Sequence, residues 1–244
     1  MKLIILHGLG QTVASYDDLK NSLTDVEVDV LELPKAKNFE RLCSLLLERL
    51  QQERESFVLF GLSLGGVLAL SLANHLPKCR GLIVSGAQYR LEGNWLFGLQ
   101  IAIMSLLPKP FYRKQGLDKA QLLELQKSMR QLDLRKEISQ LSRPTLLICG
   151  STDKPNLKPA HELNKLIPQA ELVIIEDGGH ELNVHKPAEL AQVIKQFFKR
   201  NFHEHHRSKS ACCRDYPPAP RSQGHSGRAW FQALGKSSYA QHSW

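Results

Sequence analysis

Short apolar runs alternate with longer amphipathic segments over residues 1–200. The apolar runs predict six strands, at residues 2–6, 26–31, 57–60, 81–85, 145–149 and 171–175. Most of them are continuously apolar, which is typical of strands buried on both faces of a parallel sheet. Residues 26–31 instead alternate between valine and acidic side chains, so we expect this strand at an edge of the sheet.

The segments between these runs repeat apolar residues at three- and four-residue spacing, which favours amphipathic helices. They predict helices at residues 16–23, 39–53, 64–74, 159–166 and 187–201. We expect Pro159 and Pro187 in first turns, where the missing N–H has no cost. Strands that alternate with helices at this spacing predict βαβ units and a parallel sheet.

Residues 87–143 interrupt this alternation. The segment is too long for one crossover and shows no clear strand; residues 93–108 carry no charge, and 118–138 has the pattern of one amphipathic helix. We therefore predict a helical insertion lying over the end of the sheet.

The uncharged part of this insertion supplies candidate substrate-binding residues. Trp95, Phe97, Ile101 and Met104 would line an apolar pocket beneath the insertion. Ordinary core packing explains the same four side chains equally well. Docking on a membrane is a weaker interpretation, because no basic flank precedes the segment.

The pattern ends at about residue 203. Residues 203–244 are rich in His, Ser, Arg, Gly and Pro, and they supply half of the net charge of +8. We expect one domain over residues 1–202 and a disordered extension, native or not, over 203–244. The remaining charge forms no basic run interleaved with aromatic residues, so we expect no nucleic-acid partner.

Cysteine usage and the N-terminus favour a cytoplasmic protein. The five cysteines are odd in number and scattered, which indicates reduced thiols. Residues 3–6 are too short an apolar run for a signal peptide, and no stretch reaches the roughly 18 apolar residues of a membrane span. The histidines and cysteines near the C-terminus (His203, His205, His206, Cys212 and Cys213) lack zinc-site spacing, so we expect no metal.

The candidate nucleophile is Ser63. It lies in Gly61-Leu62-Ser63-Leu64-Gly65, between an apolar strand and a helical pattern. A nucleophile elbow needs this context, because the serine occupies a strained turn and the glycines let the backbones pass closely. In isolation the same pattern is often a plain turn.

The candidate acid and base follow later strands. Asp153 comes after residues 145–149, and His180 comes after 171–175. Catalytic groups collect at the carboxyl edge of a parallel sheet, and the order Ser, Asp, His suits a triad in which histidine takes the serine proton. Asp153 as a helix cap, Asp177 as the acid and His185 as the base are the alternatives.

The candidate oxyanion hole uses two backbone N–H groups. One belongs to Leu64, directly after the nucleophile, and the other to Leu9, with Gly10 as the alternate. The turn at residues 6–11 is otherwise a glycine-rich connection. It lacks the lysine pattern of a phosphate-binding loop.

Together, His7-Gly8, the motif around Ser63, Asp153 and Gly179-His180 resemble the α/β-hydrolase superfamily over residues 1–200. The resemblance implies hydrolysis through an acyl-enzyme without a cofactor. It also implies the sheet order 2-1-3-4-5-6, in a compact form that lacks the family's first two strands, and a cap where residues 87–143 stand.

We therefore expect a serine hydrolase whose partner is a small-molecule substrate, an ester or thioester of small or medium size with an apolar part. C–C hydrolysis, acyl transfer or a lyase reaction on the same scaffold are alternatives, and a non-catalytic small-molecule binding protein is another. The sequence carries no signal for oligomeric state.

Overall fold

A parallel six-stranded sheet forms the centre of the computed structural model, which describes residues 1–113 and 118–202. In chain order the strands are β1 Lys2–Leu6, β2 Val28–Leu31, β3 Phe57–Leu62, β4 Cys79–Ser85, β5 Thr145–Gly150 and β6 Ala170–Ile175. Their order across the sheet is β2-β1-β3-β4-β5-β6, and each neighbouring pair is parallel. This confirms the predicted sheet.

The burial of each strand follows its sequence pattern. Every residue of β3 and β5 is buried, whereas most of β6 and the first half of β2 are partly exposed. β2 and β6 are the two edges, as the alternating sequence predicted for the former. β2 begins at Val28, two residues later than the pattern suggested.

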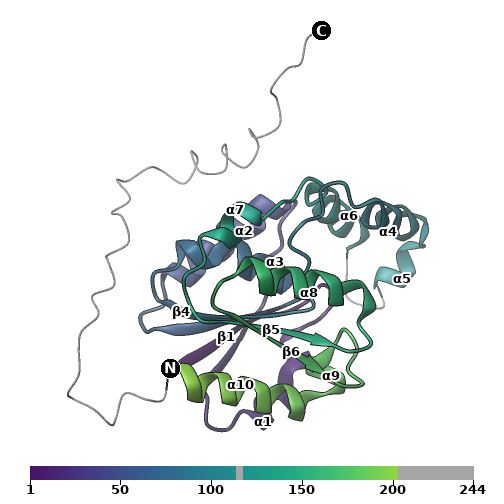
Figure 1. The fold of residues 1–244 in the computed structure, drawn as a ribbon. Helices are drawn as coiled ribbons and strands as arrows, with labels where there is room; N and C mark the ends of the chain where they lie inside the picture. Colours follow the sequence, from purple (N-terminus) through teal and green to yellow (C-terminus); the bar gives the residue numbers. More distant parts are fainter. Residues whose placement is uncertain (114–117, 203–244) are drawn as a thin grey trace, which may run out of the picture. The chain divides into compact units, whose positions relative to one another are not determined.

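Helices cover both faces of the sheet (Figure 1). One face carries α1 Asp17–Ser22, α9 Leu182–His185 and α10 Pro187–Phe202, together with the 3₁₀ helix η1 Val13–Tyr16. The other carries α2 Phe39–Gln51, α3 Leu64–Leu72 and α8 Lys154–Leu166, with the 3₁₀ helix η2 Ala73–His75 after α3. Leu3 and Ile5 of β1 belong to the same buried cluster as Leu190 and Ile194 of α10, because alternate strand residues face the same layer.

Helix α8 differs from its prediction. It begins at Lys154 rather than at residue 159, so Pro155 lies in the first turn and Pro159 lies inside the helix. The expected first-turn place of Pro159 is therefore wrong. The earlier start adds Asn156 to the buried face that Ala160 and Leu163 form, and the chain accepts the helical hydrogen bond that Pro159 cannot make.

The insertion between β4 and β5 is helical in its described part. It contains α4 Trp95–Leu106, α5 Lys109–Arg113, α6 Lys119–Ser128 and α7 Arg135–Ser139, beside one end of the sheet (Figure 1). The single helix expected at 118–138 is wrong. The chain breaks between α6 and α7, where Leu91 N–H donates to Leu132 O at 2.8 Å and Leu134 N–H donates to Tyr89 O at 2.9 Å. These tertiary hydrogen bonds replace the helical ones.

None of the helices within residues 1–113 and 118–202 combines the length and the apolar character that crossing a membrane would require. The predicted extension, residues 203–244, lies outside the described residues.

Candidate active site

Ser63 forms the whole connection between β3 and α3. Its backbone has φ 55° and ψ −115°, a region that residues other than glycine rarely adopt. Its N–H donates to Ser85 O on β4 at 2.8 Å, which holds the turn against the sheet. Such strain persists only where the surroundings enforce it, and it is typical of functional sites.

Two glycines make this turn possible. A Cβ on Gly65 would overlap the carbonyl oxygen of Leu6 on β1, and a Cβ on Gly61 would overlap the carbonyl group of Gly65. The backbones of strand and helix therefore pass at a distance that only glycine permits. As a result, Ser63 projects at the carboxyl end of β3.

His180 and Asp153 form a close pair. The imidazole Nδ1 lies 2.8 Å from Asp153 Oδ2, and the aspartate side chain is almost fully buried. A carboxylate only accepts hydrogen bonds, so Nδ1 carries the proton and Nε2 keeps its lone pair. The hydrogen bond to Asp153 raises the pKa of His180 above its ordinary value, although partial burial of the ring works in the opposite direction.

Asn156 supports this pair, although sequence reasoning assigned it no role. Its Nδ2 donates to both carboxylate oxygens of Asp153, at 2.9 and 3.0 Å. It also lies 3.2 Å from His180 Nδ1, but two donors cannot share that contact, so we assign the amide hydrogens to the carboxylate. The signal in the sequence was an asparagine three residues after the acid, one helical turn away.

The two loops that carry the pair are joined by hydrogen bonds. Thr152 donates to Gly178 O through its N–H at 2.9 Å and through its hydroxyl at 2.8 Å. A Cβ on Gly150 would overlap the carbonyl oxygen of Gly178, so the loops after β5 and β6 are in direct backbone contact. This contact is what brings residues 153 and 180 together.

Gly86 links the pair to the elbow. It follows Ser85, the backbone partner of Ser63, and a Cβ at this position would lie 3.0 Å from His180 Nδ1 and 3.2 Å from Asp153 Oδ2. Among the described residues the Ser63 hydroxyl makes no hydrogen bond to His180. Such contacts in ligand-free sites are commonly long and tighten when substrate binds.

The rival acid and base lie elsewhere. Asp177 is exposed, and its N–H donates to Ser151 Oγ at 2.9 Å. His185 is exposed on α9. Asp153 stands at the N-cap position of α8, but its side chain makes no capping hydrogen bond and contacts His180 instead.

The candidate oxyanion loop is a tight turn after β1. Gln11 N–H donates to Gly8 O at 3.2 Å, and Gly10 between them has φ 80°. This turn leaves Leu9 at its tip. His7, just before the turn, is not a second base, because its Nδ1 contacts Gly8 O at 2.9 Å and its Nε2 accepts from Leu33 N–H at 3.3 Å.

A cavity of about 540 Å³ lies beside this turn. Leu9 and Leu64, the two predicted N–H donors, both line it, and Leu64 is the first residue of α3, where a helix leaves its N–H groups without an intrahelical partner. The other apolar lining residues are Leu33, Pro34, Ala36, Leu42, Leu122 and Leu125. The polar part of the lining includes Glu32, Lys35, Asp118 and Gln121.

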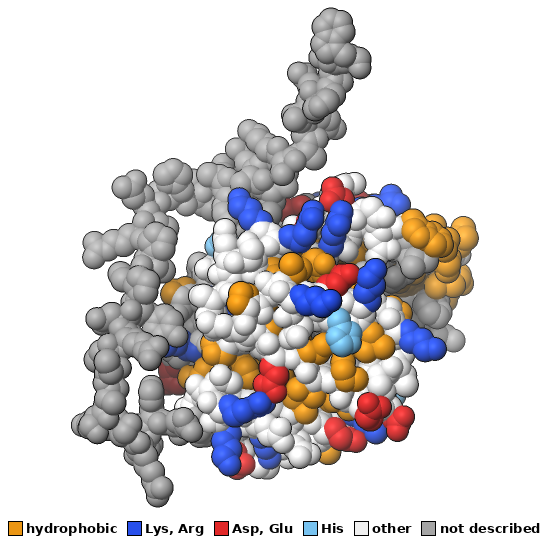
Figure 2. Space-filling view, viewed as in Figure 1, with side chains coloured by type: hydrophobic (Ala, Val, Ile, Leu, Met, Phe, Trp, Pro, Cys, Tyr) orange, Lys and Arg blue, Asp and Glu red, His pale blue; other side chains and the backbone are white. Residues whose placement is uncertain are grey.

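The insertion reaches this cavity through α6 and not through α4. None of Trp95, Phe97, Ile101 and Met104 lines the cavity. Ile101 is buried. Trp95 is 72% exposed and belongs to an exposed apolar stripe along α4 that also contains Leu99, Ile103 and Leu106 (Figure 2). Leu122 and Leu125, which sequence reasoning missed, take the place expected for the α4 residues.

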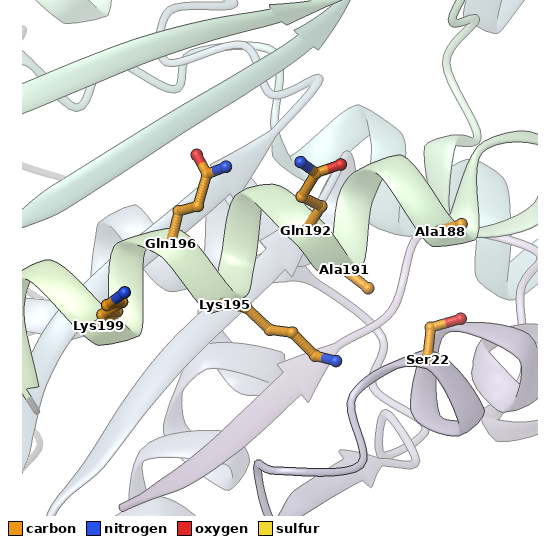
Figure 3. A pocket seen from close by; sticks show the side chains of 7 residues that line it. All are labelled: Ser22, Ala188, Ala191, Gln192, Lys195, Gln196 and Lys199. Carbon is orange, nitrogen blue, oxygen red and sulfur yellow. The ribbon is translucent and has the colours of Figure 1, made fainter.

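A second, shallower cavity of about 320 Å³ follows α10 beside Ser22 of α1 (Figure 3). Its lining is Ser22, Ala188, Ala191, Gln192, Lys195, Gln196 and Lys199, which includes no acid and no histidine. The Ser22 hydroxyl donates to Asp18 O at 2.9 Å within its own helix.

Metal-binding side chains are not grouped in the described chain. No cluster of three or more His, Cys, Asp or Glu residues within residues 1–113 and 118–202 has the geometry to hold an ion. His203, His205, His206, Cys212 and Cys213 lie outside the described residues.

A serine elbow at the carboxyl edge of a parallel sheet, next to a paired histidine and aspartate, defines the class of α/β hydrolases. The sequence profile of the alpha/beta hydrolase family matches residues 3–193, and the chain belongs to this family.

Individual relatives are distant. The chain is 28% identical over 187 residues to a pimeloyl-[acyl-carrier protein] methyl ester esterase of Xanthomonas axonopodis pv. citri, a match that spans 57% of this chain and 70% of that protein. It is 27% identical over 67 residues to a putative 2-succinyl-6-hydroxy-2,4-cyclohexadiene-1-carboxylate synthase of Bacillus subtilis, which spans 28% of this chain and only 24% of that protein.

Solved structures share the fold at low identity. MenH from S. aureus superposes with a TM-score of 0.69 at 19% identity, covering 82% of this chain and 94% of that one. A hydrolase from Pseudomonas aeruginosa has a TM-score of 0.68 at 22% identity, covering 81% and 89%. At these identities the likeness establishes the fold.

Proposed function

We propose that the protein is a serine hydrolase that cleaves a carboxylic ester or thioester, with Ser63 as nucleophile, His180 as base and Asp153 as the orienting acid. The observation that carries this proposal is the His180–Asp153 hydrogen bond of 2.8 Å beside a strained serine elbow. A buried carboxylate that fixes the Nδ1 tautomer aims the basic Nε2 away from itself, as proton transfer from a serine requires.

The proposed reaction has two halves. His180 Nε2 takes the hydroxyl proton as Ser63 Oγ attacks the substrate carbonyl, and the protonated imidazole gives that proton to the leaving alcohol or thiol. The acyl group remains on Ser63. Water then repeats the sequence, giving its proton to His180 and releasing the carboxylic acid with the serine hydroxyl restored.

Backbone N–H groups of Leu9 and Leu64 are the proposed oxyanion donors. Both residues line the same cavity, and Leu64 begins α3, whose N-terminus adds positive partial charge. Donors of this kind stabilise the tetrahedral intermediate more than the ground-state carbonyl, so they raise kcat.

The proposed substrate has an apolar part of small or medium size. The cavity beside the oxyanion loop holds about 540 Å³, and six leucines contribute to its lining: Leu9, Leu33, Leu42, Leu64, Leu122 and Leu125. The relative from Xanthomonas, named as a methyl ester esterase, is consistent with ester cleavage.

A matched pair of serine variants tests the proposal. Ser63→Ala should lower the hydrolysis of p-nitrophenyl butyrate by about 10⁴-fold or more. Ser22→Ala, in the groove of Figure 3, should leave it unchanged. Retained hydrolysis in a folded Ser63→Ala protein would refute the assignment, and an inactive wild type that binds a small molecule tightly would favour the binding-protein alternative.

A further inference from the structure

We propose that Gln11 is a positioning residue that couples the oxyanion loop to the loop of the catalytic base. This inference rests on the proposed function. Gln11 is 8% exposed and stands between the turn after β1 and the segment that follows His180, although 170 positions separate them in the chain. It is not among the triad or the oxyanion donors.

The carbonyl end of the Gln11 side chain holds the oxyanion loop. Its Oε1 accepts from Gly8 N–H at 3.1 Å and from the buried Tyr16 hydroxyl at 2.9 Å. With the Gln11 N–H to Gly8 O bond of 3.2 Å, residues 8 and 11 are joined twice, and Leu9 is held at the tip of a closed turn. Since Gly8 N–H is engaged, Leu9 supplies the next donor along the loop.

The amide end holds the histidine loop. Its Nε2 donates to Glu181 Oε1 at 3.0 Å and to Asn183 Oδ1 at 3.1 Å. Glu181 is the neighbour of His180, and Asn183 is fully buried and anchored by its own donation to Ser15 O at 2.8 Å. A displacement of Gln11 therefore reaches both sides of the site.

The side chain has no freedom to turn over. A glutamine amide offers two donors and an oxygen with two acceptor positions, and the four contacts use them all. A flipped amide would place its NH₂ group against the Gly8 N–H and its oxygen against the Glu181 carboxylate. The buried Gly8 N–H would then have no acceptor, and the two oxygens would repel each other. The arrangement thus determines the distance between the Leu9 turn and the His180 loop.

Such a link has a kinetic signature that a purely structural contact lacks. Misplacing an oxyanion donor or a base by about 1 Å costs transition-state stabilisation and hence kcat, up to about 10²-fold. Gln11 also lines the 540 Å³ cavity, but the polar atoms of its side chain are bonded to Gly8, Tyr16, Glu181 and Asn183, so we expect substrate binding there to change little. KM should therefore remain near its wild-type value.

The test compares Gln11→Glu and Gln11→Ala with wild type. Gln11→Glu is nearly isosteric and keeps the acceptor for Gly8 and Tyr16, but it loses the donors to Glu181 and Asn183. Gln192→Ala, an exposed glutamine in the α10 groove, is the matched control. Each kcat is divided by the fraction of sites that react with a fluorophosphonate, so that unfolded protein does not count.

We expect both Gln11 variants to lose at least about 10-fold in kcat with KM changed less than about 3-fold. Affinity for a trifluoromethyl ketone, whose adduct with Ser63 carries the same oxyanion, should fall in parallel. If neither variant folds, Asn183→Ser, which removes one acceptor of the Gln11 amide, should show the same kcat-only loss on a smaller scale.

Unchanged kcat and ketone affinity in an active enzyme, with only a lower unfolding midpoint, would overturn the role of Gln11 and leave the hydrolase assignment intact. A wild type that neither hydrolyses esters nor reacts with the fluorophosphonate would overturn both.

Discussion

At the residue scale, two side chains donate hydrogen bonds to the Asp153 carboxylate and so fix the orientation of the His180 ring. Asp153 accepts from His180 Nδ1, while Asn156 occupies the same carboxylate with both of its bonds. The aspartate is thereby held in place, and in the proposed mechanism its carboxylate stabilises the imidazolium that forms when the serine loses its proton. The same contact raises the pKa of His180, which affects the pH range of activity.

Activity should rise with pH through an inflection above about 6.5, the ordinary histidine value. The reason is that His180 must be neutral to act as base, and a raised pKa keeps it charged to higher pH. The pH dependence of kcat/KM measures this. An inflection below the ordinary value would contradict the role of Asp153.

Asp153→Asn provides the complementary result. It should lower kcat by about 10⁴-fold, the loss seen when the orienting aspartate of a serine protease is replaced in this way. It should also lower the pKa of His180, since the raising contact is gone, and NMR titration of the ring can follow this without activity. A pKa that stays raised would show that another group causes the shift.

Candidate catalytic side chains could be proposed from the sequence where a motif carries them. Ser63, Asp153 and His180 follow strands and were proposed from that pattern alone. Gln11 and Gly86 were not, because their roles consist of contacts across more than 60 positions, and no local pattern encodes such a contact. Asn156 lay within reach of a local argument, but the helix was predicted to begin only at residue 159, which left Asn156 outside it.

At the element scale, the approach of α3 to β1 is what shapes the elbow. The backbone contact between Gly65 and Leu6 leaves no space for a side chain, so the helix can start directly after the serine. This requirement differs from that at Gly93, where φ is 70° but a Cβ would meet nothing within 4 Å.

Gly65→Ala should therefore destabilise the protein by about 3 kcal/mol or more, because backbone must move. Gly93→Ala, the matched control, should cost only about 1 kcal/mol for its left-handed conformation. Urea unfolding of the two variants measures both free energies. Equal costs would mean that close approach does not determine the elbow.

The insertion makes a second element-scale prediction. Leu125 of α6 lines the cavity and Trp95 of α4 does not. Leu125→Phe should lower kcat/KM for p-nitrophenyl octanoate by about 10-fold, because the added volume excludes a long apolar chain. The kcat/KM for p-nitrophenyl acetate should stay unchanged.

Trp95→Ala should leave that chain-length preference unchanged, since its side chain is largely exposed. The opposite pattern, with Trp95 controlling chain length, would restore the interpretation drawn from sequence.

The inward-facing side chains of this insertion were hard to predict because its uncharged sequence is apolar on every side, which hides the face of the helix that turns inward.

On the scale of the whole molecule, the parallel sheet brings loops that are far apart in the sequence to one edge, where they form the candidate site. β1, β3, β5 and β6 each deliver one loop to the same edge, and parallel pairing was readable from their continuously apolar sequences. The sheet order itself followed from family resemblance, because apolar runs do not state which strands are neighbours.

The described domain should be sufficient for activity. A chain that ends at Phe202 keeps the edge-to-face contacts of that ring with Phe197 and Phe198, both at 5.7 Å. We expect its kcat to match the full chain and its free energy of unfolding to agree within about 0.5 kcal/mol. Ending at Asn201 should cost about 1 kcal/mol more by removing the ring. A large loss of kcat in the first case would show that residues 203–244 contribute to the site.

The central claim is that Ser63 is a nucleophile activated by His180, and covalent labelling tests it most directly. The folded protein is incubated with a fluorophosphonate, and the modified peptide is mapped by mass spectrometry. We predict a single adduct on Ser63 whose rate of formation falls by more than about 10³-fold in His180→Ala. No adduct, an adduct on another residue, or an unchanged rate in His180→Ala would contradict the account.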